Sequence, residues 1–116
     1  MNTAFRAAAL LLLCPALLHA ATVPTVAYEK TVTLRGVVSK NFTLTLKQGI
    51  RIEGLAAACP KDAKQGAVYR MITLHDPLDR VSQMVGKEVQ VEGEFASCGF
   101  LKGQPSLDMV SITPAR

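Results

Sequence analysis

The chain has 116 residues, of which 49% are hydrophobic and 19% charged, and its formal net charge is +4. This length suits one small domain with a thin margin of stability. Nucleic acid is a poor partner for so mild a charge with no basic cluster, and beyond the N-terminal region no apolar run approaches the roughly 20 residues of a membrane span.

The first twenty residues have the layout of an export signal. Residues 1–6 are basic, 7–18 are apolar, and small residues follow His19. We expect cleavage after Ala20, with Ala21 as the alternative, which leaves about 96 residues carrying 12 basic and nine acidic side chains. The mature chain is therefore predicted to be periplasmic or secreted, with a flexible leader over 21–28 and one domain over 29–113.

The cysteines fit that compartment. Cys14 leaves with the export signal, and Leu13 before it and Pro15 after it argue against lipid attachment there. Cys59 and Cys98 then remain alone in an oxidising environment, where two thiols favour one disulfide. The alternative is two free cysteines, one of them reactive.

Two strands are predicted before the first long loop. Residues 30–40 alternate between apolar and polar side chains, with Gly36 where a bend or bulge is common. After a tight turn at Asn41, residues 42–53 form either one bent strand or two short ones. The apolar positions of these two segments are Val32, Leu34, Val38, Phe42, Leu44, Leu46, Ile50 and Ile52.

The middle of the chain is less regular. Within the loop 54–67, three alanines allow one helical turn that Pro60 would stop. A third strand is expected over 68–75, although both of its faces are mixed. Asp79 is the predicted cap of a short helix over 80–85, which Gly86 ends.

The last two strands flank a hairpin loop. Residues 87–96 alternate most clearly, with Val89, Val91 and Phe95 on one face and Gly93 interrupting that face. The loop 97–105 carries Cys98, and the final strand is expected over 106–113.

Five strands with one apolar face each, and a short helix between the third and fourth, predict an all-β, five-stranded OB-fold-like barrel. A flat sheet of this size would leave two open edges, whereas a closed barrel removes them and buries the apolar face. In this topology the loops after the second and fourth strands lie at the same end, and they carry Cys59 and Cys98.

Two segments resemble a known group of domains. MVGKEVQVEGEFASCGFLKGQPSLDMVSI, from Met84 to Ile112, resembles the closing hairpin of small bacterial exported OB-like domains of unknown function, and VTLRGVVSKNFTLTLKQGIRIEG, from Val32 to Gly54, resembles their opening strands. Some of those domains carry a histidine-rich loop in the closing hairpin. The corresponding loop here, 97–105, has no histidine, so no metal role follows from the resemblance.

The residue inventory disfavours catalysis and cofactors. Zinc requires about four ligands, and the mature chain has one histidine, His75, besides the two cysteines. No nucleophile elbow or phosphate-binding glycine loop occurs. Asp76 and Asp79 are explained by capping. We therefore predict no metal, no cofactor and no enzymatic activity.

A binding surface remains. OB barrels bind ligands across the outer face of their second and third strands, framed by the first and fourth loops. The candidate ligand-binding residues there and at the hairpin tip are Lys47, Arg51, Tyr69, Met71, His75, Phe100, Leu101 and Lys102. The alternatives are that the polar residues only cover a solvated sheet and that Phe100 and Leu101 fold back onto the barrel.

Three functions fit this surface. The first is an exported binding module that docks a periplasmic protein or an envelope component. The second is a secreted inhibitor or immunity-type protein that blocks an enzyme through the loop at Phe100–Leu101 or at 59–64. The third, which the residue inventory disfavours, is a small enzyme that depends on His75.

Overall fold

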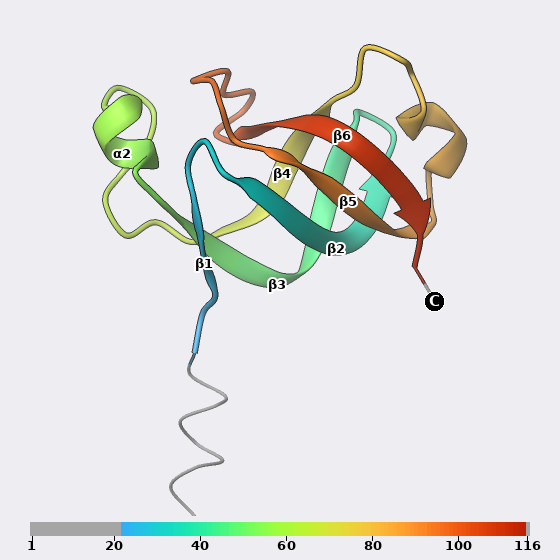
Figure 1. The fold of residues 1–116 in the computed structure, drawn as a ribbon, viewed down its shortest axis with the longest axis horizontal. Helices are drawn as coiled ribbons and strands as arrows, with labels where there is room; N and C mark the ends of the chain where they lie inside the picture. The colour runs from blue at the N-terminus through green and yellow to red at the C-terminus, as the bar shows by residue number, and fades with distance from the viewer. Residues whose placement is uncertain (1–21, 116) are drawn as a thin grey trace, which may run out of the picture.

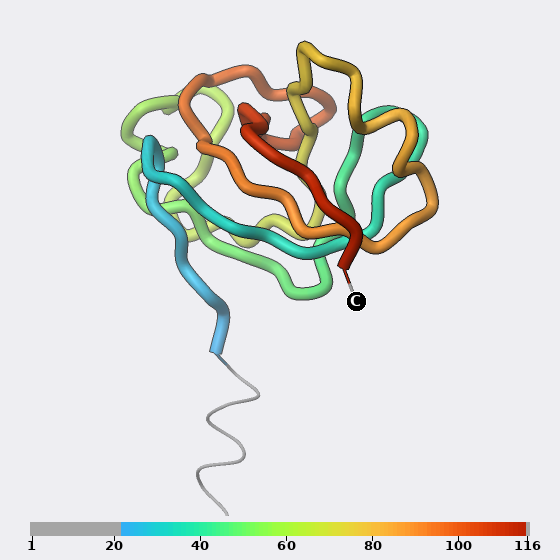
Figure 2. Tube along the Cα trace, turned by 45° about the vertical axis from the view of Figure 1, so that its right-hand side comes forward, coloured from blue at the N-terminus to red at the C-terminus, as the bar shows by residue number. Residues whose placement is uncertain are grey.

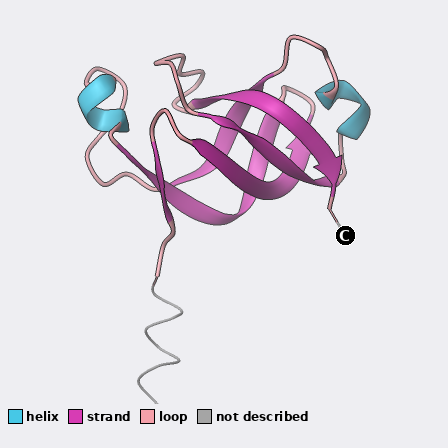
Figure 3. Cartoon of the chain, in the orientation of Figure 1, coloured by secondary structure: helices cyan, strands magenta, loops and turns pink. Residues whose placement is uncertain are grey.

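The computed structural model describes residues 22–115, and the predicted export signal lies outside the described residues. Figure 1 shows strands wrapped into a barrel, and Figure 3 shows the two short helices at opposite ends of it. The elements are β1 (Thr25–Ala27), β2 (Thr31–Ser39), β3 (Thr43–Glu53), α2 (Leu55–Ala58), β4 (Tyr69–His75), the 3-10 helix η1 (Val81–Met84), β5 (Glu88–Glu94) and β6 (Ser106–Pro114).

Five strands close into a ring in the order β2-β3-β4-β6-β5, because β3 also pairs with β4. All neighbours in the ring are antiparallel except β4 and β6, which pair in parallel through Thr73 and Ser106. Figure 2 follows β2, β5 and β6 side by side across one wall. With η1 between β4 and β5, the third and fourth ring strands in chain order, this is the predicted OB-fold-like barrel.

The interior is formed by the alternating side chains of these strands. β2 buries every second residue, and the same period of two buries Val89, Val91 and Gly93 in β5. Phe95 directly after β5 is completely buried. The expected apolar faces therefore meet in one core, and their burial is the main term that favours folding.

Two glycines allow neighbouring strands to approach where the barrel turns. A Cβ on Gly36 would overlap the carbonyl oxygen of Thr45, and a Cβ on Gly93 would overlap that of Asp108. The register also shifts opposite Gly93, where Val110 becomes an extra residue on β6 and is 61% exposed. The predicted bends at Gly36 and Gly93 are thus sites of close backbone contact.

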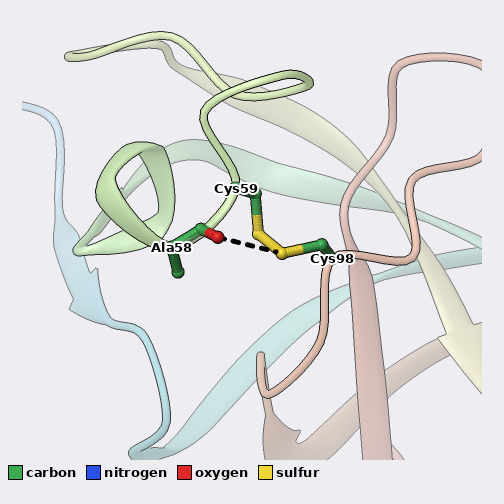
Figure 4. Close-up of a disulfide and its surroundings, with 3 residues drawn as sticks. All are labelled: Ala58, Cys59 and Cys98. Carbon is green, nitrogen blue, oxygen red and sulfur yellow. Dashed lines mark hydrogen bonds between the residues drawn. A yellow bond between two sulfur atoms is a disulfide. The ribbon is translucent and has the colours of Figure 1, made fainter.

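The predicted disulfide is confirmed. Cys59 and Cys98 are bonded with a Cα–Cα distance of 5.5 Å, joining the loop after β3 to the loop after β5. Figure 4 shows the Ala58 carbonyl oxygen facing Cys98 Sγ, at 3.4 Å. Because a disulfide sulfur carries no proton, this is a contact and not a conventional hydrogen bond.

The expected flexible leader over 21–28 needs correction. Residues Thr25–Ala27 form β1, which pairs in parallel with Arg51, Ile52 and Glu53 of β3. β3 leaves β2 after Leu46, so its later residues have a free edge that β1 covers. A three-residue strand gives little alternation, which is why the sequence pattern did not reveal it.

The predicted cap at Asp79 is wrong: the N-cap position of the short helix is Arg80, no side chain caps it there, and Asp76 organises the turn that leads into it. The buried Asp76 carboxylate accepts hydrogen bonds from the backbone N–H groups of Leu78, Arg80 and Val81 and from the Arg80 guanidinium. Asp79 instead lies in a turn with φ +55°. The helix is also shorter than the predicted 80–85, covering Val81–Met84.

Burial would by itself raise the pKa of Asp76. The hydrogen bonds from Val81, Arg80 and Leu78 outweigh that effect and hold the pKa below its ordinary value. The carboxylate therefore stays charged inside the turn.

Among residues 22–115, no helix is long and apolar enough to cross a membrane.

Candidate functional site

A cleft of about 700 Å³ lies between the turn that joins β2 to β3 and the loop that joins β5 to β6. We call it the inter-turn cleft. Its lining residues come from three separate segments: Ser39, Lys40, Asn41, Phe42 and Thr43; Met71; and Leu101, Lys102 and Gln104. These are the first and fourth loops of the barrel with the third strand between them, which is the region where OB folds bind ligands.

The loop between β5 and β6 ends in a tight two-residue turn. Leu101 and Gln104 exchange backbone hydrogen bonds of 3.0 and 2.9 Å, and Lys102 and Gly103 between them have φ values of +54° and +78°. Two positive φ angles in a two-residue loop are typical of a type I′ turn, whose twist matches that of a β-hairpin. The turn therefore presents Leu101 and Lys102 on a defined backbone.

Gln104 fastens this turn to the barrel wall. Its Oε1 accepts hydrogen bonds of 3.3 Å from the hydroxyls of both Thr43 and Thr73. These threonines are directly paired across β3 and β4. One side chain thus spans the outer face of both strands and forms one wall of the inter-turn cleft.

The opposite wall is the turn at residues 40–42, and here a prediction was wrong. Phe42 was expected on the buried face of the second strand, but it precedes β3, has φ +56° and is 37% exposed. Its carbonyl oxygen accepts a 2.7 Å hydrogen bond from the N–H of Leu74. That bond holds the Phe42 backbone in place, and Phe42 is one of the residues that line the cleft.

The structure brings three of the predicted ligand-binding residues together in the inter-turn cleft: Met71, Leu101 and Lys102. Two others, Arg51 and Tyr69, line a separate hollow of about 240 Å³ near the disulfide loop, which we call the Arg51 pocket. There Arg51 Nε donates a 3.3 Å hydrogen bond to the carbonyl of Gly66. Burial raises the pKa of Tyr69, so its hydroxyl stays protonated.

The remaining predicted residues lie elsewhere. Lys47 lines a third hollow of about 330 Å³, between β1 and β2, and forms an exposed 3.0 Å ion pair with Glu88. His75 is exposed at the end of β4, opposite Asp108 of β6. Phe100 is half-buried, and its ring meets the Tyr69 ring edge-on with the ring centroids 6.3 Å apart. This part of the hairpin tip therefore folds back onto the barrel, which was one of the two alternatives.

Sequence reasoning missed Phe42, Asn41 and Gln104 as cleft residues. Phe42 continued the apolar alternation of the following strand, which placed it on the wrong side. The Lys102–Gly103 pair was the available clue to a tight turn at this position. Nothing in the sequence indicated that Gln104 would reach two threonines, because those contacts span 61 and 31 residues.

The chemistry of the cleft is that of recognition groups. Its lining has two lysines, two amides, two hydroxyls and three apolar side chains, with no carboxylate, histidine or cysteine. Within residues 22–115 no three His, Cys, Asp or Glu side chains gather in a way that could hold a metal ion.

The fold and the cleft define the chain as a small disulfide-linked β-barrel of the OB-fold-like class with an open cleft between two turns. No known protein family, curated protein or solved structure matches the chain. The resemblance to small exported bacterial domains therefore stays a prediction.

Proposed function

We propose that this protein is a non-enzymatic binding module, exported to the periplasm or the medium, that docks a protein or another envelope component in the inter-turn cleft. The observation that carries the proposal is the position of this cleft. It is larger than the Arg51 pocket, and it lies on the barrel face where OB folds bind ligands.

The rest of the molecule supports a binding role. The buried Asp76 carboxylate has its hydrogen-bonding capacity taken up by the turn that follows it, and His75 lines none of the three hollows. The Cys59–Cys98 disulfide fits an oxidising compartment and so supports export.

The test is quantitative capture of partners by cross-linking. The full chain, with its predicted export signal, is expressed in a bacterium and cross-linked to its neighbours in the cell envelope. The cleft variant carries Met71→Asp and Leu101→Asp, which place two charges on the apolar lining. The matched control carries Leu78→Asp and Val110→Asp, two exposed positions, 71% and 61% accessible, that do not line the cleft.

We expect a specific cross-linked partner with the wild type and with the control, and at least a tenfold loss with the cleft variant. Equal capture by all three proteins would overturn the cleft as the docking site. Circular dichroism of each variant separates loss of docking from loss of folding.

A second candidate, an inhibitor that inserts a loop into an enzyme, is favoured by one observation. Leu101 is 52% exposed at the start of a type I′ turn, a rigid way to present an apolar side chain. An inhibitor of this kind would lose potency with Leu101→Asp and keep it with Met71→Asp, whereas a cleft-binding module would lose its partner with either.

A further inference from the structure

The inter-turn cleft gathers three exposed apolar side chains. Phe42, Met71 and Leu101 are 37%, 44% and 52% accessible, and each comes from a different segment of the chain. Single exposed apolar residues are normal on a protein surface, but three that converge in one concavity mark a contact site. The centre of the cleft therefore suits an apolar group of the ligand.

The backbone under this apolar centre is held in an uncommon conformation. A positive φ is rare for a bulky residue such as Phe42 and costs free energy that the surroundings must offset. The hydrogen bond from the Leu74 N–H to the Phe42 carbonyl is one such compensation. The fold thus places Phe42 in the apolar lining of the cleft instead of in the core.

The charges of the cleft have one sign. Lys40 comes from the turn between β2 and β3, and Lys102 from the turn between β5 and β6. The ion pairs found among residues 22–115 are Lys47–Glu88 and Arg80–Asp76, so neither cleft lysine has a carboxylate partner there. With no carboxylate in the lining, each of the two turns that form the cleft offers one positive charge next to an apolar residue, Lys40 near Phe42 and Lys102 beside Leu101.

We propose that the cleft recognises an extended acidic segment of another protein, with one large apolar side chain between acidic residues. This inference rests on the proposed function and gives the chemistry of its partner. The apolar side chain would contact Phe42, Met71 and Leu101, and the flanking carboxylates would pair with Lys40 and Lys102. A cleft of about 700 Å³ is within the range of ~300–1,000 Å³ found for sites that enclose a small ligand, so it accepts a short segment.

Other occupants fit less well. A neutral sugar would leave both lysines without a counter-charge, and a nucleic acid would need more cations along its phosphates than two. An anionic membrane is flat, whereas these apolar side chains lie in a hollow. An acidic segment with an apolar centre satisfies both the shape and the charge.

The experiment is a titration of the isotope-labelled mature chain, disulfide intact, followed by NMR. The probe is the pentapeptide Glu-Glu-Leu-Glu-Glu, capped at both ends. We expect shifts concentrated at residues 39–43, 71 and 101–104, and at least tenfold weaker binding when the peptide leucine is replaced by serine. Binding should also weaken with added salt, because the paired charges are exposed.

Matched variants separate the two kinds of contact. The double variant Lys40→Gln, Lys102→Gln should bind the peptide at least fivefold more weakly. Lys61→Gln, which changes an exposed lysine outside the cleft, should leave peptide affinity unchanged. Leu101→Ser should lower peptide affinity tenfold, while Leu78→Ser, at the more exposed position, should leave that affinity unchanged.

Three results would overturn this inference: equal binding of a peptide with lysines in place of the glutamates, shifts centred outside the cleft, or no peptide binding together with binding to anionic phosphatidylglycerol vesicles. A partner that is captured by the wild type and lost with the cleft variant, while the peptide fails to bind, would reject the acidic segment and leave the proposed function standing.

Discussion

The two connections that flank β5 are held in place by different means. The connection before it, from β4, is tied by Asp76, whose buried carboxylate binds groups two to five residues further along the chain. The connection after it, to β6, is tied to distant segments, by Cys98 to Cys59 and by Gln104 to Thr43 and Thr73.

The two connections also differ in whether their residues line a hollow. The first connection uses its polar group internally, and its residues line none of the three hollows. The second is fastened at its base and at its last turn residue, which leaves Leu101 and Lys102 free to line the inter-turn cleft. A loop anchored by long-range contacts can thus be both rigid and open to a ligand.

Removing the covalent tie should have the largest effect on stability. Replacing both Cys59 and Cys98 by serine should lower the free energy of unfolding by about 4 kcal/mol, because the unfolded chain loses a loop constraint spanning 39 residues. Urea unfolding of the oxidised wild type and of the double variant measures this. A loss below ~1 kcal/mol would show that the second connection does not depend on its disulfide.

Asp76→Ala should come next, with a loss of about 3 kcal/mol. The substitution leaves three backbone N–H groups of the first connection without their shared acceptor and Arg80 without its carboxylate partner. Asp79→Asn is the control, since Asp79 is exposed and asparagine tolerates its positive φ, and it should change stability by less than ~0.5 kcal/mol. Equal effects of the two substitutions would remove Asp76 as the organiser of this turn.

The same carboxylate predicts a dependence on pH. Its pKa is lower in the folded protein than the ordinary 3.8, so its contribution to stability is complete above that value. The contribution is lost as pH falls through the folded-state pKa. Acid unfolding of the wild type should therefore steepen below about pH 4, and Asp76→Asn should lack that component. Parallel acid profiles for the two proteins would contradict this.

Gly103→Ala should have the smallest effect, about 1 kcal/mol. Gly103 has φ +78° and nothing lies within 4 Å of where a Cβ would be, so the cost comes from the backbone alone. Because the substitution strains the type I′ turn, it should also weaken peptide binding in the cleft. Unchanged stability and binding would show that the turn does not fix Leu101 and Lys102.

Much of the barrel could be predicted from local patterns. Period-two alternation identified the buried face of β2, with Val32 and Leu34, and that of β5, with Val89 and Val91. Gly36 and Gly93 marked the bends. The disulfide followed from counting cysteines. Errors arose where alternation continued past a real boundary, as at Phe42, or where a local capping pattern was assigned to Asp79 although Asp76 organises the turn.

The sequence by itself determined the five ring strands, the apolar faces of β2 and β5 and the pairing of Cys59 with Cys98, because each depends on near neighbours or on a choice of two. Only the tertiary structure decided the cleft, the pairing of β1 and the reach of Gln104. The cleft is built by two turns some sixty residues apart, which become neighbours when the ring of strands closes. Contacts that exist only after closure leave no periodic trace in the chain.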